Sequence, residues 1–186
     1  GTITDGTMTV TRYIEYNRRS EYNVEDIISS MNTALQETNS TSKALETYFG
    51  FGKKMTPVEI FPFSSDTKYS AVTFEKEGTF ILGAPEFVLK NNYERVADDV
   101  NEYANQGLRV LALAHSQLPL KNGVIQRVPR IVALILIEDQ IRREAYDTIK
   151  FFKDNGVQVK VISGDNPVTV SEVAKRVGIE NAEDYI

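Results

Sequence analysis

The chain has 186 residues and a mass of 20.9 kDa, which fits one domain or two small ones. Its composition, 41% hydrophobic and 25% charged, is that of a soluble chain able to bury a core rather than of a disordered tail. A net charge of −5 argues against nonspecific binding to nucleic acid. The absence of cysteine excludes disulfides, thiolate zinc sites and cysteine nucleophiles. Because His115 is the only histidine, a Ser-His-Asp triad and a multi-histidine metal site are nearly excluded as well.

The longest uninterrupted apolar run, Ile131–Ile137, is far shorter than the roughly 20 residues needed to cross a bilayer. No signal peptide opens the chain. The sequence starts at Gly1 without an initiator methionine, so we expect it to be a piece of a larger protein.

Residues 1 to about 128 carry a mixed α+β pattern. The expected strands are Thr7–Tyr16, Pro57–Phe61, Lys68–Glu75, Thr79–Leu82 and Arg109–Ala114. The expected helices are Val24–Gln36, a short one through Ala44 to Phe49, a short one opened by Pro85, and Tyr93–Gln106. A turn is expected at Asn122–Gly123, and the boundary of this region at Gln126–Arg130.

From Val128 onward the pattern changes to β-α-β-α. Ile131–Ile137 and Val157–Ile162 are apolar on both faces, as buried strands of a parallel sheet are, and each is followed by a helical pattern, over Arg142–Lys153 and Thr169–Val177. We expect an open parallel sheet here. We also expect its strands to exchange amide hydrogens faster than those of the first region, since sheet partners are missing.

Two loops follow those strands, at the edge where open α/β sheets bind ligands. Ser163–Pro167 has small residues before a helix N-terminus, which favours phosphate binding, and Asp165 there indicates a divalent metal. The alternative is a plain turn in which Asp165 or Asn166 caps the helix. Asp139 and Arg142 follow the other strand and either converge on the same crevice or form an acidic cap and a solvated arginine.

In the first region, Phe63 and the Gly83–Ala84 pair bracket a predicted hairpin. An exposed aromatic side chain beside small residues is suited to stacking a base, whereas the alternative is that Phe63 belongs to the core. The Gly50–Lys54 segment lacks the spacing and the Ser or Thr of a phosphate loop.

Five motifs in order resemble those of P-type ATPases, across nearly the whole chain. Gly1–Gly6 (GTITDG) resembles the end of the family's DKTGTLT signature, and Leu82–Glu86 (LGAPE) resembles KGAPE. The other three are Gly107–Ala112 (GLRVLA), Asp139–Arg142 (DQIR, for DPPR) and Ser163–Asn166 (SGDN, for TGDN). The chain is therefore identified as a member of this family.

The resemblance implies an α/β fold in two parts. Residues 8–128 would be an α+β nucleotide-binding domain, an antiparallel sheet flanked by helices. Residues 1–7 and 129–186 would belong to a partial parallel α/β phosphorylation domain, Rossmann-like and haloacid dehalogenase-like. The family's nucleophilic aspartate would lie before Gly1, so no catalytic residue and no complete magnesium site are expected in this chain, and the fragment alone is expected to be inactive.

The resemblance also implies roles for particular residues. Phe63 would stack the adenine of ATP, with Lys68 and Gly83 nearby. Asn39 sits where the family often has a carboxylate that contacts the adenine amino group. Arg109 and Arg142 would contact the nucleotide, and Asp139 would lie at the hinge to the phosphorylation domain. Ser163, Gly164 and Asp165 would cradle the γ-phosphate near Mg²⁺. In the parent, the partners of this cytoplasmic part would be ATP or ADP and the transmembrane and actuator domains of the same chain, which transports a cation.

Several positions depart from the family pattern. Leu82 replaces the motif lysine, Asn39 replaces the carboxylate, Gln140 and Ile141 replace both prolines, and Ser163 replaces threonine. If Leu82 points toward the nucleotide, Leu82→Lys is expected to tighten ATP binding; if Leu82 is a core residue, the variant loses stability instead. Two other functions stay open: a soluble haloacid dehalogenase-like phosphatase, and a degenerate nucleotide-binding or regulatory module.

Overall fold

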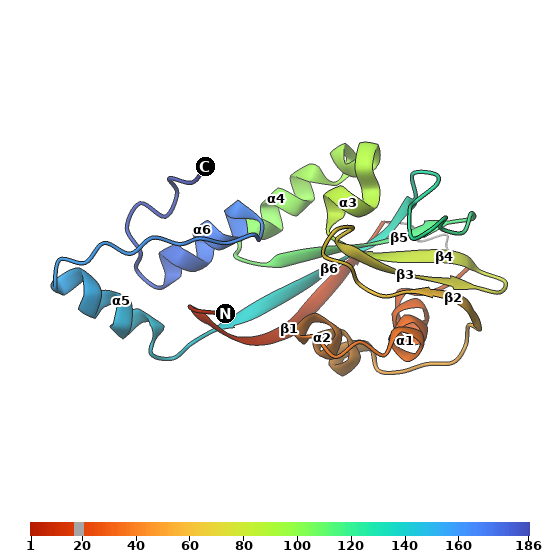
Figure 1. The fold of residues 1–186 in the computed structure, drawn as a ribbon, viewed down its shortest axis with the longest axis horizontal. Helices are drawn as coiled ribbons and strands as arrows, with labels where there is room; N and C mark the ends of the chain where they lie inside the picture. Colours follow the sequence, from red (N-terminus) through yellow and green to blue (C-terminus); the bar gives the residue numbers. More distant parts are fainter. Residues whose placement is uncertain (17–20) are drawn as a thin grey trace.

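The computed structural model describes residues 1–16 and 21–186. One six-stranded sheet forms its centre, in the order β1-β6-β5-β4-β3-β2 (Figure 1). The strands are β1 (Thr4–Glu15), β2 (Pro57–Phe61), β3 (Tyr69–Phe74), β4 (Gly78–Gly83), β5 (Arg109–Ser116) and β6 (Arg130–Ile141). The helices are α1 (Val24–Leu35), α2 (Ser40–Phe49), α3 (Pro85–Leu89), the 3₁₀ helix η1 (Lys90–Arg95), α4 (Ala97–Asn105), α5 (Ala145–Asp154) and α6 (Pro167–Arg176).

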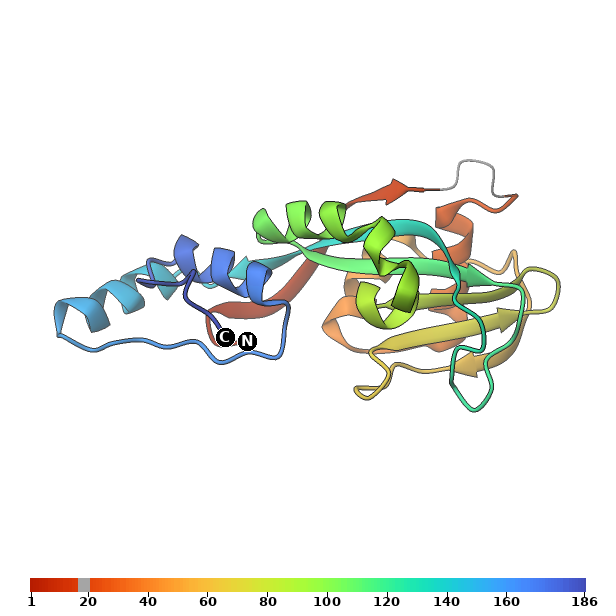
Figure 2. The same cartoon turned by 90° about the horizontal axis from the view of Figure 1, so that it is seen from above.

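Helices cover both faces of the sheet. Figures 1 and 2 show α1 and α2 on one face and α3 with α4 on the other, while α5 and α6 lie beyond one end of the strands. The expected antiparallel sheet flanked by helices is thus confirmed. Of the helices described, none is long and apolar enough to cross a membrane.

Local sequence explains where the helices on the first face begin. The Asn23 side chain accepts a hydrogen bond from the backbone of Asp26, and Asn39 accepts one from Ser42 at 2.8 Å, so both asparagines act as N-caps. In α1, the apolar residues Ile27, Ile28 and Met31 share one face and are fully buried. The amphipathic pattern therefore sets which side of each helix meets the sheet.

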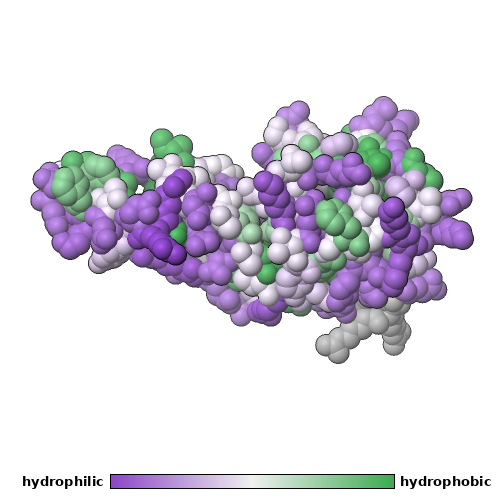
Figure 3. Space-filling view, turned by 90° about the horizontal axis from the view of Figure 1, so that it is seen from below, coloured by the Kyte–Doolittle hydropathy of each residue, from purple (hydrophilic) through white to green (hydrophobic). Residues whose placement is uncertain are grey.

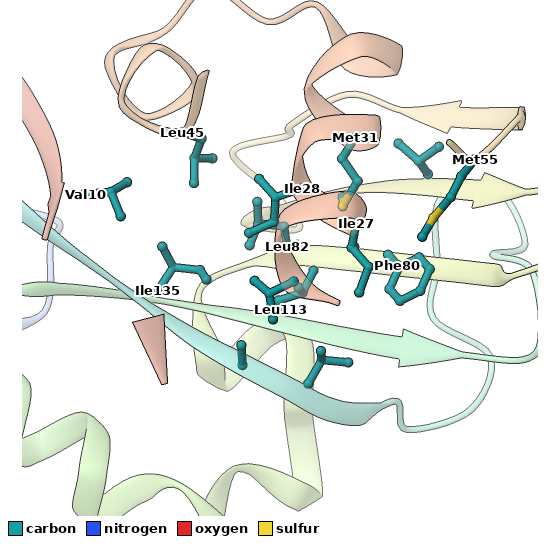
Figure 4. Packing of buried hydrophobic residues seen from close by; sticks show 14 of the residues in the cluster. Val10, Ile27, Ile28, Met31, Leu45, Met55, Phe80, Leu82, Leu113 and Ile135 are labelled. Carbon is teal, nitrogen blue, oxygen red and sulfur yellow. The ribbon is translucent and has the colours of Figure 1, made fainter. Parts of the chain in front are cut away.

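Alternation along the strands divides the core into two layers. In β4, Phe80 and Leu82 pack on the side of α1 and α2, and Ile81 packs on the side of α3 and α4. Figure 4 shows Leu82 beside Ile28 and Leu113 in the first layer. Leu82 is only 6% exposed.

The predicted parallel sheet in the second region is wrong. β6 pairs antiparallel with β1 on one side and β5 on the other, so its edges are largely occupied. Ile131–Ile137 is apolar on both faces because helices cover both faces of an antiparallel sheet, which produces the same pattern as a parallel one. Residues 157–162 form no strand and are mostly exposed, with Ile162 98% exposed. Figure 3 shows hydrophobic side chains gathered at this end of the molecule, near α5.

The first of the two expected domain limits crosses a continuous strand, and the second lies between elements. The limit between residues 7 and 8 falls inside β1, and residue 129 immediately precedes β6. Both strands run from the sheet toward the end of the molecule that holds α5 and α6. A third, smaller apolar cluster there joins Ala145 of α5 to Ala174 and Val177.

Hydrogen exchange tests this arrangement. Because β6 is buried and bonded on both sides, we expect its central amides to exchange at least as slowly as those of β3, contrary to the expectation from sequence. The fast amides of the second region should instead be those of residues 157–162. Rapid exchange throughout Ile131–Ile137 would contradict the sheet order.

Candidate nucleotide site

A cavity of about 750 Å³ opens where the α2 N-terminus, the β2–β3 loop, the β4–α3 junction, the start of β5 and the loop before α6 meet. Residues distant in sequence thus share one space. Seven of the nine residues predicted to bind nucleotide line it: Asn39, Phe63, Lys68, Gly83, Arg109, Gly164 and Asp165. Its walls combine an aromatic ring, backbone, cations and carboxylates.

Phe63 lies on the rim of the cavity. Its side chain is 49% exposed, so Phe63 is not a core residue. Its backbone N–H donates to Oε1 of Glu37, with N and O 2.6 Å apart, which ties the β2–β3 loop to the α1–α2 loop. A half-exposed ring on a tethered backbone has a free face for stacking.

Lys68 and Gly83 occupy the next part of the wall. A Cβ atom on Gly83 would lie 2.3 Å from the carbonyl oxygen of Lys68 and 2.6 Å from Cα of Tyr69, so only glycine permits this close approach of β3 and β4. Lys68 has a left-handed backbone, with φ of 60°, and its carbonyl accepts from Ala84. The small residues of the LGAPE motif therefore shape the wall through backbone packing.

Arg109 joins the sheet to the loop before α6. Its Nε donates to Asp139 at 2.5 Å, and its two terminal nitrogens donate to both oxygens of Asp165 at 2.9 and 2.7 Å. Asp139 is 8% exposed and Asp165 43% exposed, so one ion pair is buried and the other is near solvent. From the sequence, convergence of Asp139 and Arg142 on the crevice of the Ser163–Pro167 loop was one of two alternatives. The structure instead joins Asp139 to Asp165 through Arg109.

Electrostatics fix the charge of this cluster. Burial by itself lowers the pKa of Arg109, but its hydrogen bonds to Asp139 and Asp165 raise that pKa above its ordinary value. The guanidinium therefore stays protonated. Among the described atoms, Oδ1 of Asp139 is buried without a hydrogen-bond partner.

Side-chain hydrogen bonds within the Ser163–Pro167 loop hold the turn that leads into α6. Asn166 accepts from the backbone of Val168 and Thr169 at 3.0 and 3.3 Å, and Ser163 Oγ accepts from the N–H of Asp165 at 3.2 Å. The Thr169 hydroxyl donates to the carbonyl of Leu108 at 2.9 Å, which fixes the start of α6 against β5. Asn166, rather than Asp165, is the helix cap.

The two remaining predicted residues do not line the cavity. Ser163 follows the exposed segment 157–162. Arg142 lies at the end of β6, where its guanidinium donates to the carbonyls of Thr2 and Gly1 at 3.0 and 3.1 Å. Arg142 thus secures the first residues of the chain in this structure.

The described residues do not fit a magnesium site. No group of three or more Asp, Glu or His side chains among them is placed to hold a metal ion. Both oxygens of Asp165 accept a hydrogen bond from Arg109, a cation whose charge opposes binding of a metal ion beside it. Asp165 by itself does not supply the ligands that a resident cation requires.

Sequence reasoning missed two carboxylates of the cavity wall, Glu37 and Glu86. Glu37 lies two residues before the cap of α2, and Glu86 is the second residue of α3. An acidic residue beside a helix start has many structural uses, so Glu37 carried no signal in the sequence, and Glu86 was marked only as the last residue of the LGAPE motif. Only the fold brings them into the same cavity as the cations Lys68 and Arg109.

Comparison with known proteins identifies the class. The family model described as haloacid dehalogenase-like hydrolase matches residues 1–186, and the chain belongs to this family. The chain is 35% identical over 189 residues to the probable cation-transporting ATPase exp7 of Streptococcus pneumoniae, covering 100% of the chain and 24% of that protein. It is 32% identical over 180 residues to the calcium-transporting ATPase CtpE of Mycobacterium bovis, covering 96% of the chain and 22% of that protein.

These similarities confirm the resemblance to P-type cation-transporting ATPases. A more distant relative is the endoplasmic reticulum transmembrane helix translocase of Saccharomyces cerevisiae, 28% identical over 151 residues, covering 72% of the chain and 12% of that protein. The chain spans about a quarter or less of the length of these relatives.

The two ion pairs of Arg109 predict unequal effects on stability. Asp139→Asn weakens the buried pair and is expected to lower the free energy of unfolding by about 1–3 kcal/mol. Asp165→Asn weakens the solvent-exposed pair and is expected to lower it by less than about 1 kcal/mol. Urea unfolding of both variants measures the difference; a larger loss in Asp165→Asn would contradict the assigned burial.

Leu82 carries a second stability prediction. Leu82→Lys places an ammonium group among buried apolar residues and is expected to lower the free energy of unfolding by about 2 kcal/mol, limited by the adjoining cavity, through which the ammonium can reach water. Leu82→Met keeps the apolar volume and serves as the control, with a loss below about 1.5 kcal/mol. Thermal unfolding measures both variants; wild-type stability in Leu82→Lys would mean that this side chain is not part of the core.

Proposed function

We propose that the chain is the ATP-binding part of a P-type cation-transporting ATPase. The observation that carries this proposal is the single cavity in which a half-exposed aromatic ring, Phe63, and a permanently charged cation, Arg109, face the same space. A ring suits an adenine base, and a guanidinium suits phosphate oxygens. The motif order and the relatives support the same assignment.

In this proposal different cavity residues contact different parts of the nucleotide. Phe63 stacks the base, Lys68 lies nearby, and Gly83 keeps the strands close enough to form the wall. Arg109 binds the phosphates, and Gly164 and Asp165 face the γ-phosphate, with Ser163 behind them. A phosphate that reaches Arg109 has to compete with Asp165, since both are negative and share the same donors. We therefore expect weak binding of ATP and ADP by the isolated chain.

The parent would transfer the γ-phosphoryl group to an aspartate outside this chain and use the resulting acyl phosphate to drive cation transport. Magnesium would neutralise phosphate charge in that reaction. Asp139 would lie at the hinge to the phosphorylation domain, and Arg142 would hold the strand that follows the aspartate. The exposed apolar surface around α5 and residues 157–162 would be covered by the rest of that domain.

The location proposed for this part is the cytoplasmic side of an integral membrane protein, in contact with its transmembrane and actuator domains. The relatives named as cation-transporting ATPases support this placement. The transport activity, the transported ion and the partner domains belong to the whole protein, in which this chain would bind the nucleotide.

A nucleotide titration tests the proposal. ATP is expected to shift the amide resonances of Phe63, Gly83 and Arg109, and Phe63→Ala is expected to weaken binding about tenfold through loss of stacking. Phe51→Ala serves as the matched control, because Phe51 is 65% exposed and does not line the cavity. With γ-labelled ATP and magnesium, the chain is expected to stay unlabelled.

Three results would contradict the proposal. Shifts confined to residues 163–166 would remove the stacking role of Phe63. A stable, hydroxylamine-sensitive label on the chain would place the nucleophile inside it and favour a phosphatase. Absence of any nucleotide binding would favour a degenerate regulatory module instead.

A further inference from the structure

Methionine is the side chain of this sequence that peroxides oxidise most readily. The chain contains three methionines, no cysteine and no tryptophan. The sulfur of methionine reacts with peroxide to give a sulfoxide, at a rate that follows its accessibility. Met31 is fully buried and Met55 is 5% exposed, whereas Met8 is half-buried and lines the candidate nucleotide cavity. Access through the cavity therefore distinguishes Met8 from the other two methionines.

The sheet places Met8 beside the ion pairs of Arg109. Met8 of β1 is the cross-strand partner of Asp139 in β6, and Asp139 accepts from Nε of Arg109 at 2.5 Å. Directly opposed residues of two strands share one face of the sheet, with Cβ atoms about 5 Å apart. The Thr41 hydroxyl donates to Sδ of Met8 at 3.5 Å, and Thr41 also lines the cavity. The sulfur is thus held at the cavity wall, near the cation proposed to bind phosphate.

Oxidation changes this part of the wall from apolar to polar. The sulfur attacks one oxygen of hydrogen peroxide, an S–O bond forms as the O–O bond breaks, and the other oxygen leaves as water with both protons. The sulfur loses two electrons and the peroxide gains them. The product, methionine sulfoxide, is polar and carries an oxygen that accepts hydrogen bonds.

The donors of Arg109 connect this modification to ligand binding. A guanidinium has five N–H donors. The hydrogen bonds to Asp139 and Asp165 use three of them. The sulfoxide oxygen and a phosphate oxygen would both accept from the two that remain. An oxidised Met8 would therefore compete with the phosphates for the same cation.

We propose that Met8 is an oxidation site through which peroxide reversibly weakens the binding of ATP. This inference rests on the proposed function. Methionine sulfoxide reductases of the A and B types restore the thioether, one type for each epimer of the sulfoxide. Reversal by these enzymes separates the modification of Met8 from irreversible damage to the fold.

Peptide mass spectrometry after treatment with dilute hydrogen peroxide measures the selectivity. Met8 is expected to be oxidised about tenfold faster than Met31 and Met55, because the cavity gives peroxide access to its sulfur. Saturating ATP is expected to slow the oxidation of Met8 and to leave the rates of the two buried methionines unchanged.

Calorimetry measures the effect on binding. The affinity of the wild-type chain for ATP is expected to fall about threefold when Met8 is oxidised, and to recover after treatment with both reductases. Met8→Leu is the matched control, since leucine keeps an apolar side chain that cannot form a sulfoxide while Met31 and Met55 remain. Its affinity for ATP is expected to be the same before and after peroxide.

Three outcomes overturn this inference alone. Oxidation of Met31 or Met55 as fast as Met8 would contradict the role of the cavity in access. Unchanged affinity after complete oxidation of Met8, or an equal loss of affinity in Met8→Leu, would mean that this sulfur does not control binding. If the untreated wild type does not bind ATP, the proposed function itself fails, and the inference fails with it.

Discussion

The long antiparallel pair of β1 and β6 is the constraint on which the rest of the structure depends. Each strand has 12 residues, and their pairing extends from Glu15 with Ala133 to Thr4 with Ile141. The hydrogen bond from Arg142 N–H to the Ile3 carbonyl continues this pairing beyond the sheet. Two paired strands resist bending far more than a single connection, so this ribbon sets where α5 and α6 lie relative to the sheet.

Arg109 provides the second attachment between the sheet and the end of the molecule that holds α5 and α6. It begins β5, which lies on the opposite side of β6 from β1, and it binds Asp165 in the loop before α6. One cation faces two carboxylates, so the cluster carries a net negative charge before any anion arrives. Asp139 is held in the protein interior, whereas Asp165 lies on an exposed loop. Under the proposed function, an incoming phosphate would displace Asp165 more readily than Asp139. Occupation of the cavity would then be coupled to the position of the loop before α6 through this shared guanidinium.

The cavity exists because loops from separate elements stop at the same side of the sheet. Each wall is fixed by one specific contact. These contacts are Glu37 with the Phe63 backbone, Gly83 against Lys68, and Thr169 with the Leu108 carbonyl. None of these contacts is close in sequence. The result is a space lined by an aromatic ring from the β2–β3 loop and by a guanidinium from the start of β5, groups suited to a base and to phosphate oxygens.

The sequence by itself determined the local elements and the family. Periodicity located the helices, alternation located the strands of the first region, and five ordered motifs identified the class. Seven of the nine residues that the sequence predicted to bind nucleotide line the cavity.

Only the tertiary structure decided how the pieces pair and which side chains meet. The apolar pattern of Ile131–Ile137 is the same whether the neighbouring strands are parallel or antiparallel, since burial on both faces depends on the helices that cover the sheet. For the same reason, Val157–Ile162 formed no strand: an apolar pattern provides the side chains for a sheet but not the partner that supplies its hydrogen bonds. The joining of Arg109 to Asp165 and of Glu37 to Phe63 likewise depends on contacts across 56 and 26 residues, which local propensity does not encode.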